Sequence, residues 1–444
     1  MPTRNQGIAG RITYAYDSRY LAEFNFGYNG SENFEKGSRF GFFPSFALGY
    51  LISNEDFFQP LSKVITNLKL RASYGLVGNA DIGSTRFPYL TKVNLSGAGF
   101  TFGNEWQTTS TGAIITTYGA KNVTWEIGKK YNLGFDMQLF SKFNLNVDFF
   151  REDRKDIFLR RNTISAESGI TGDLKPYGNL GKVRNEGIDM SLDYNHTINK
   201  DFTISAKGTF TYAKNQYKAI DEPDYEFSYM SQVGRPLNQY KGYIALGLFK
   251  DQEDIDNSPK QILTGVVQPG DIKYADLNKD GKIDGNDQTY IGYPELPQIS
   301  YGFGFSLQYK KWDFSMFFQG VAKRSIMIGD IHPFGGESYG VMQYVADNCW
   351  TEENPNSNAL YPRLTNGKNN NNNPYSTYWL RDGSYLRLKN AEIGYTYKFL
   401  RAYLSGQNLL TFSKFKLWDP ELYTTNGLKY PTQIMGAIGL QLTF

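Results

Sequence analysis

The chain has 444 residues, which is enough for one large sheet-based domain or for two or three small ones. The formal net charge of +3 gives no reason to expect a nucleic-acid partner. Cys349 is the single cysteine, so an intrachain disulfide is excluded, and His196 and His332 are too few for a histidine-rich metal site. We find no apolar run long enough for a transmembrane helix and no apolar leader within Met1–Gly7, so we expect neither a membrane helix nor a signal peptide.

Aromatic residues make up 16% of the chain, with 33 Tyr and 32 Phe beside 45 Gly. This balance suits β-strands and the aromatic girdles that flank a membrane. The mean hydropathy of -0.49 is low for a membrane protein. It is compatible with a transmembrane barrel, because the lumen and the loops of a barrel are polar. Composition alone fits a soluble β-rich protein equally well.

The N-terminal part of the chain predicts a hairpin, with strands at 7–16 and 20–28 joined by a turn at Asp17–Arg19. Further strands are expected at 40–51 and 68–74, where apolar residues alternate with polar or small ones. Residues 79–125 contain no regular alternation, so we expect this stretch to be mostly loop.

The clearest hairpin is predicted at 131–150. Its apolar face is Tyr131, Leu133, Phe135, Met137 and Leu139, followed by Phe143, Leu145, Val147 and Phe149. The alternate positions are rich in amides and carboxylates, as in Asn132, Asp136 and Asp148. Soluble sandwiches also alternate, but strands of about ten residues or more with so polar a second face favour a transmembrane barrel.

Period-two strands also occur at 188–194, 202–206, 301–309 and 312–318. Short turns at Asp17, Ser141, Asn199 and Lys310 alternate with long polar loops, which are expected at 29–39, 79–125, 157–180, 214–237 and 323–380. Short turns on one rim and long loops on the other are typical of a membrane barrel. We count about 14 to 16 strands from these patterns. Asn369–Asn373 is expected to be a solvated, mobile loop tip.

Shared parity predicts which side chains face lipid. The outward set is predicted to include Phe135, Leu145, Val147, Leu192, Phe305, Leu440 and Phe444.

An acidic loop within 268–292 carries oxygen ligands at the spacing that Ca²⁺ requires. The predicted ligands are Asp276, Asn278, Asp280, Asp284 and Asp287, with the backbone carbonyl of Lys282. Gly281 stands where such loops turn sharply, at the sixth position. The twelfth position is Asp287 rather than Glu, which shortens its reach, and the flanks look extended rather than helical. The alternative is an acidic turn that binds no metal.

Catalysis is not indicated by the sequence, since nucleophile-elbow, zinc-protease and phosphate-loop motifs are absent. The chain is therefore expected not to be an enzyme. Tyr375, Tyr378 and Trp379 lie beside the Asn run and are suited either to stacking on sugar rings or to an interfacial girdle.

The C-terminal segment alternates again at Tyr385–Lys389 and at 438–444, and the chain ends on the aromatic Phe444. Four motifs precede that end, namely Asp382–Asn390, Ser405–Phe412, Trp418–Glu421 and Tyr430–Pro431. In this order, they resemble the closing segment of SusC/RagA-type TonB-linked outer-membrane transporters. Leu68–Gly75 with Gly78–Asn79, and Pro269–Asp271 with Asp276–Gly281, are also similar to segments of that family.

The resemblance implies an all-β fold, with residues 1–444 as the C-terminal part of an antiparallel transmembrane barrel that contains no plug domain. It implies a location among the lipids of the outer membrane and the import of oligosaccharides or peptides. It also implies a SusD-like lipoprotein as lid partner, and TonB contact only through an N-terminal part missing from this chain. We therefore expect a fragment or a truncated form that performs no energised uptake alone.

Two other interpretations remain open at this point. One is a passive porin or a surface adhesion barrel. The other is a soluble β-rich carbohydrate-binding protein, which spontaneous solubility without detergent would favour.

Overall fold

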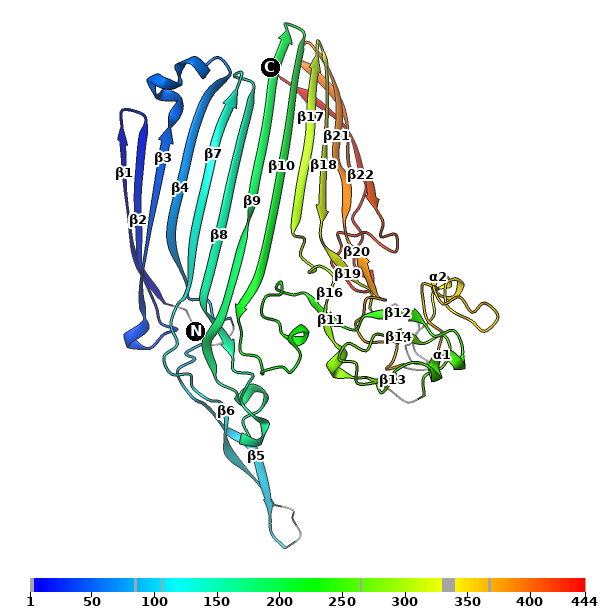
Figure 1. Ribbon diagram of the computed structural model, residues 1–444. Coiled ribbons are helices and arrows are strands. Elements are labelled where there is room, and N and C mark those ends of the chain that lie inside the picture. The colour runs from blue at the N-terminus through cyan, green and yellow to red at the C-terminus, as the bar shows by residue number, and fades with distance from the viewer. Residues whose placement is uncertain are drawn as a thin grey trace. The chain divides into compact units, whose positions relative to one another are not determined.

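The computed structural model describes residues 4–83, 86–104, 106, 108–263, 266–329, 340–365 and 369–443. Phe444 and His332, singled out from the sequence, lie outside these residues. The described chain is dominated by antiparallel strands, which Figure 1 labels in chain order. Its two α-helices, α1 (Gln252–Asp256) and α2 (Gln343–Asp347), have five residues each. No helix among the described residues is long and apolar enough to cross a membrane.

Thirteen strands form one large sheet, and their order across the sheet follows their order in the chain. They are β1 (Asn5–Tyr16), β2 (Tyr20–Ser31), β3 (Phe40–Leu51), β4 (Ile65–Asn79), β7 (Glu126–Leu139), β8 (Phe143–Arg160), β9 (Tyr177–Asn199), β10 (Phe202–Ala219), β17 (Ile299–Tyr309), β18 (Trp312–Ala322), β21 (Tyr385–Tyr397), β22 (Leu400–Ser413) and β23 (Met435–Leu442). The expected antiparallel barrel-type sheet is therefore confirmed. The large sheet has thirteen strands among the described residues, close to the expected 14 to 16.

The other described strands are short or lie in separate two-stranded sheets. They are β5 (Lys92–Phe102), β6 (Thr108–Thr117), β11 (Tyr240–Gly242), β12 (Ala245–Leu248), β13 (Lys260–Gln261), β14 (Ile272–Tyr274), β15 (Lys282–Ile283), β16 (Thr289–Ile291), β19 (Ser325–Met327) and β20 (Leu380–Asp382). These ten strands thus form small local sheets and do not extend the large one.

By contacts the chain divides into two compact units. Unit 1 comprises 1–191, 213–224 and 232–234, and unit 2 comprises 192–212, 225–231 and 235–444.

In unit 1, large apolar side chains from successive strands share one face of the sheet. Cross-strand pairing places Ile12, Phe24, Phe46, Tyr74 and Tyr131 in one row across five strands. Directly opposed residues of an antiparallel pair lie on the same face. Many of these large apolar side chains are exposed, which is expected of a surface whose solvent is hydrocarbon.

The hairpin of β7 and β8 confirms the predicted parity. Phe135 lies opposite Val147, and Met137 lies opposite Leu145. Val147 is only 5% exposed while Phe149, two residues further on the same face, is 47% exposed. Side chains on this face therefore differ in exposure, although all of those named here are apolar.

The opposite face of the same strands carries ion pairs. Arg71 contacts Asp136 at 2.8 Å and Asp148 at 3.0 Å, so that one guanidinium joins three adjacent strands. Fork-shaped pairing of this kind suits Arg better than Lys. The polar parity predicted for Asp136 and Asp148 is thus confirmed, and the sheet has one apolar and one polar face.

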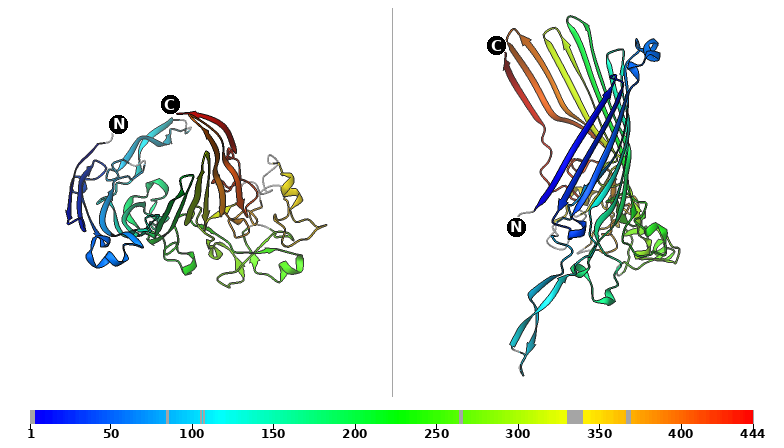
Figure 2. Two further views of the ribbon diagram at one scale, coloured as in Figure 1. Left: turned by 90° about the horizontal axis from the view of Figure 1, so that it is seen from above. Right: turned by 90° about the vertical axis from the view of Figure 1, so that its left-hand side faces the viewer.

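Residues 92–117 correct the expectation of a loop. They form the hairpin of β5 and β6, which projects beyond the ends of the long strands of unit 1 (Figures 1 and 2). Its register shifts three times, between Lys92 and Val93, Asn94 and Gly97, and Gly97 and Phe100. Each shift breaks the period of two, so the alternation that identifies a strand was absent from the sequence.

Unit 2 repeats the two-faced pattern. A row of Tyr309, Trp312, Tyr395, Ala402 and Leu440 crosses its strands on the apolar face. Leu192 is 43% exposed and Phe305 is 37% exposed, as predicted for outward positions. On the polar face, Arg401 of β22 contacts Glu392 of the neighbouring β21 and Asp313 of β18, one strand further along the sheet.

Strand β21 contains a β-bulge. Register shifts beside Lys389 against both neighbouring strands, and Asn408 in β22 has a φ of 55°. Leu386 and Leu388 lie on the apolar face before the bulge, and Ala391 and Ile393 lie on it afterwards. The extra residue resets the parity, as β-bulges do.

Candidate functional site

The loops between β10 and β17 and between β18 and β21 contain a folded body, which we call the loop module (235–298 and 323–382). Figure 1 shows its small strands and helices at the end of β17 and β18. Its apolar core includes Tyr243, Ile272, Tyr274, Ile283, Met327, Val345, Trp350, Tyr361 and Trp379. These loops therefore have a packed core of their own and form an ordered body at this end of the strands.

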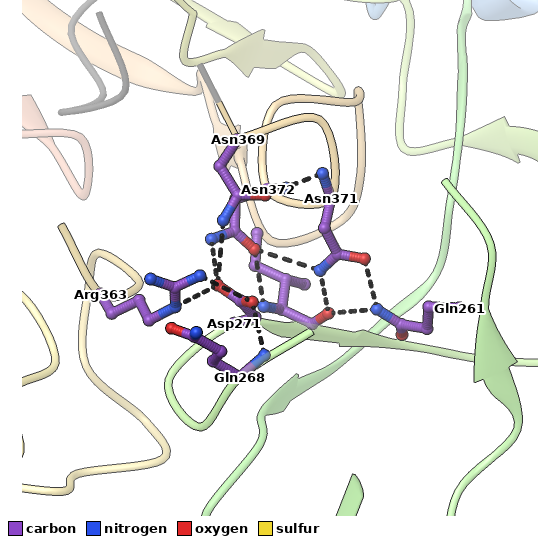
Figure 3. Close-up of polar contacts among 8 residues, drawn as sticks. Gln261, Gln268, Asp271, Arg363, Asn369, Asn371 and Asn372 are labelled. Carbon is purple, nitrogen blue, oxygen red and sulfur yellow. Dashed lines mark hydrogen bonds and ion pairs between the residues drawn. The ribbon is translucent and has the colours of Figure 1, made fainter. Parts of the chain in front are cut away.

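The Asn run corrects a second expectation, because Asn369, Asn371 and Asn372 lie in the core of the loop module rather than at a solvated tip, while Asn370 is exposed. Asn371 and Asn372 are fully buried, and Asn369 is nearly so. The Nδ2 groups of Asn369 and Asn372 donate to one carboxylate oxygen of Asp271 at 3.0 and 2.8 Å (Figure 3). Arg363 pairs with the same carboxylate at 2.8 Å, and Asp271 is 1% exposed.

The same run also completes the hydrogen bonds of β14. Asn372 Oδ1 accepts from the backbone N–H of Ile272 at 2.8 Å, and Asn371 Nδ2 donates to its carbonyl at 2.9 Å. Gln261 Nε2 donates to Asn371 Oδ1 at 2.6 Å (Figure 3). An Asn amide carries both a donor and an acceptor, so consecutive Asn side chains pair with a strand edge as another strand would. The run that was expected to be a mobile loop tip therefore makes specific hydrogen bonds to β14.

The aromatic residues beside this run have different environments. Trp379 is 1% exposed, and its Nε1 donates to the carbonyl of Asn372 at 2.7 Å. Burial raises the pKa of Tyr378, whose hydroxyl donates to the carbonyl of Ala359. Only Tyr375 is exposed among the three. Trp379 is therefore a core residue and neither a sugar platform nor part of a lipid girdle.

The acidic loop is held by its own carboxylates. Asp276 accepts from the backbone N–H groups of Lys279 and Gly281, and Asp280 accepts from that of Lys282. Asn278 accepts from the N–H of Asp280, and Gly281 has a φ of 82°, which favours glycine. These contacts fold the first half of the predicted ligand set into one tight turn.

The second half of the set is arranged differently. Asp284 caps a short 3₁₀ helix (Gly285–Asp287) by accepting from the N–H of Asn286. Asp287 is fully buried, and its two oxygens accept from the N–H groups of Leu277 and Asp284, both at 2.8 Å. Within the described residues, no group of three or more acidic, His or Cys side chains is placed to hold a metal ion. Asp276, Asn278 and Asp280 accept from backbone N–H groups within the turn, and Asp287 serves as a clamp on the backbone.

Two motifs near the C-terminus meet in space. Arg387, buried in β21, contacts Asp419 at 2.5 Å and Glu421 at 2.8 Å. Burial opposes ionisation of Asp419, but the N–H of Glu421 and the guanidinium of Arg387 hold its pKa below the usual range. The charged residues of Trp418–Glu421 thus fix the connection between β22 and β23 to the wall.

A cavity of about 820 Å³ opens on the loop module. Its walls include Lys250, Gln268, Trp350, Thr351, Glu352 and Arg363. Trp350 is only 6% exposed, so the cavity offers charged and amide groups rather than an open aromatic surface. Sequence patterns gave no sign of this cavity, because its residues come from separate loop segments.

A protein-family model described as "TonB dependent receptor-like, beta-barrel" matches residues 2–409 of the chain. TonB-dependent receptor P3 of Formosa agariphila is 30% identical over 443 residues, which cover 93% of this chain and 42% of that protein. TonB-dependent receptor SusC of Bacteroides thetaiotaomicron is 26% identical over 467 residues, covering 100% of this chain and 44% of that protein. The chain thus spans less than half the length of these relatives.

Among solved structures, the RagAB peptide transporter contains a chain with a TM-score of 0.76 and 23% sequence identity. The similarity covers 99% of this chain and 48% of that chain. At this identity, the likeness concerns the fold.

Proposed function

Because the chain belongs to the TonB dependent receptor-like β-barrel family, we propose that it forms part of the wall of an energised importer in the outer membrane. The observation that carries the proposal is the two-faced sheet, with exposed apolar rows on one side and ion pairs such as Arg71–Asp136 on the other. A membrane barrel needs this division, because lipid contacts one face and water the other. Transport, rather than catalysis, is the activity we propose.

The substrate class we propose is an oligosaccharide or a peptide. SusC is among the relatives, and the similar structure is named as a peptide transporter. The cavity of the loop module adds support, since Lys250, Glu352 and Gln268 offer both charges and an amide to a polar chain. A SusD-like lipoprotein as lid, and TonB as energy source, complete the proposal.

Uptake by cells tests this function. We expect deletion of the gene to abolish growth on one class of oligosaccharide or oligopeptide as sole nutrient, and the wild-type gene to restore it. Disruption of tonB should give the same loss, because the energy for import reaches the barrel through TonB. A nutrient whose uptake needs this gene but proceeds without TonB would contradict the proposal and favour a passive porin. Purification from membranes should also recover a lipoprotein with the chain.

We further propose that the acidic loop holds one Ca²⁺ through Asp276, Asn278, Asp280, Asp284 and Asp287 with the carbonyl of Lys282. The turn formed by the first three side chains supports the proposal, and each of their oxygens keeps a lone pair beyond its bond to the backbone. The bonds of Asp287 to the backbone favour a weak site. Its role would be to order the loop module.

Titration calorimetry on the detergent-purified chain measures this directly. We expect a dissociation constant on the order of 10⁻⁴ to 10⁻³ M, as for extracellular modules, and no binding heat after Asp276→Ala with Asp280→Ala. The control is Glu352→Ala with Glu353→Ala, which removes two exposed carboxylates of the same module and should leave the heat unchanged. If the wild type gives no heat at several times the weakest of these constants, the loop is a polar turn only.

A further inference from the structure

Three lysines gather at the short turns of unit 2. Lys310 and Lys311 join β17 to β18, and Lys398 lies in the turn between β21 and β22. The two turns are neighbours, because the N–H of Thr396 donates to the carbonyl of Lys311 at 2.8 Å. Their side chains therefore form one basic cluster at the rim opposite the loop module.

The ammonium groups of this cluster lie over rings of the apolar face. Lys311 Nζ and Lys398 Nζ lie 5.0 and 5.7 Å from the ring centroid of Tyr397, and Lys310 Nζ lies 5.5 Å from that of Tyr309. Both rings are exposed and share the parity of Trp312 and Tyr395. The charges are thus held at the outer border of the sheet by cation–π contact.

None of the three lysines has an ion pair within the part of the chain that the structure describes. The nearby Asp313 is paired with Arg401 on the polar face. In the adjoining turn, the carbonyl of Asp201 accepts from the N–H of Lys310, and Lys200 precedes Asp201 in the sequence. A small cavity of about 270 Å³ is lined by Lys310, Lys311 and Lys398, and Asp313 also lines it. Lys310, Lys311, Lys398 and Arg401 outnumber the carboxylates of Asp313 and Glu392, so the cluster keeps a net positive charge and has space for an anion.

We propose that Lys310, Lys311 and Lys398 bind the phosphate of an anionic phospholipid headgroup. Barrels place their short turns on the periplasmic side, where the outer membrane presents a phospholipid leaflet. The aromatic row of Tyr309, Trp312 and Tyr395 lies at the level where rings meet glycerol and acyl chains. The aliphatic part of a lysine side chain can cover such a ring while its ammonium group reaches a phosphate. The apolar row and the cations together match a lipid better than a free anion.

Retention of lipid by the purified chain tests this site. The chain is equilibrated in detergent with phosphatidylglycerol or with zwitterionic phosphatidylcholine, and bound lipid is counted by native mass spectrometry. We expect preferential retention of phosphatidylglycerol by the wild type. Replacing the three lysines by Gln should weaken it on the order of a hundredfold, at about fivefold for each charge near the surface. The corresponding Arg substitutions should preserve it, which guards against a loss caused by misfolding.

The matched control is Lys260→Gln with Lys414→Gln and Lys416→Gln, three exposed lysines elsewhere in unit 2. This variant has the same net charge as the rim variant and should retain phosphatidylglycerol normally. Equal retention by the wild type and the rim Gln variant would overturn the proposal, as would equal retention of both lipids. Displacement of the lipid by millimolar inorganic phosphate would also overturn it, because the site would then select free phosphate.

Discussion

Replacing Val147 by Arg is expected to prevent stable folding of the β7–β8 hairpin into a membrane. Val147 lies on the apolar face opposite Phe135 and is nearly buried among its neighbours there. A guanidinium on the lipid face of a barrel costs about 2 to 4 kcal/mol near the middle of the bilayer. We expect Val147→Arg to lower the folded fraction at each urea concentration in titrations with lipid vesicles. The folded fraction is measured from heat-modifiable migration in gels.

The neighbouring substitution Asn146→Arg provides the control. Asn146 has the opposite parity, and its Nδ2 donates to the hydroxyl of Ser191 at 3.2 Å. Loss of that bond should cost about 1 kcal/mol, and the new cation remains in water. The two variants add the same charge one residue apart. Equal destabilisation of both would contradict the assignment of Val147 to lipid.

Replacing Asp271 by Ala is expected to unfold the loop module locally while leaving the strands intact. The substitution leaves Arg363 without its partner and removes the acceptor of Asn369 and Asn372. Breaking a buried, hydrogen-bonded ion pair by removing one member costs about 3 to 5 kcal/mol. Limited proteolysis of the chain in detergent should then cut within 235–298 or 340–382 at rates well above wild type.

Two further variants separate this effect from a general one. Asp271→Asn keeps the shape but removes the charge that pairs with Arg363, so it should also sensitise the module. Asp251→Ala removes an exposed carboxylate that caps α1, for which about 1 kcal/mol is expected. Wild-type resistance in both Asp271 variants would show that the network does not hold the module together.

The sequence was sufficient for the faces of the sheet, because a period of two is a local property that each strand shows by itself. Phe135, Val147 and Leu440 could be assigned from parity alone. The bulge beside Lys389 and the irregular hairpin at 92–117 could not, since an unpaired residue destroys the period that reveals a strand.

The loop module could not be predicted from local sequence patterns, for a different reason. Asn371 and Asn372 look like a polar tip until β14, about a hundred residues earlier in the chain, is placed against them. The cavity beside Arg363 depends on similarly distant segments. The acidic loop lies between these cases, because its spacing identified the turn, while the role of Asp287 as a backbone clamp depended on the fold.

Accessibility along β8 tests most directly whether one face of this sheet meets lipid and the other meets water. Single cysteines at 144–149, in a Cys349→Ser background, are reacted with a membrane-impermeant maleimide after folding into vesicles. In parallel, nitroxide labels at the same positions are quenched by oxygen or by a water-soluble reagent. We predict a strict period of two, with positions 144, 146 and 148 open to water and positions 145, 147 and 149 closed to water, because they lie on the apolar face. Uniform reactivity, or the reversed parity, would contradict this assignment of the two faces.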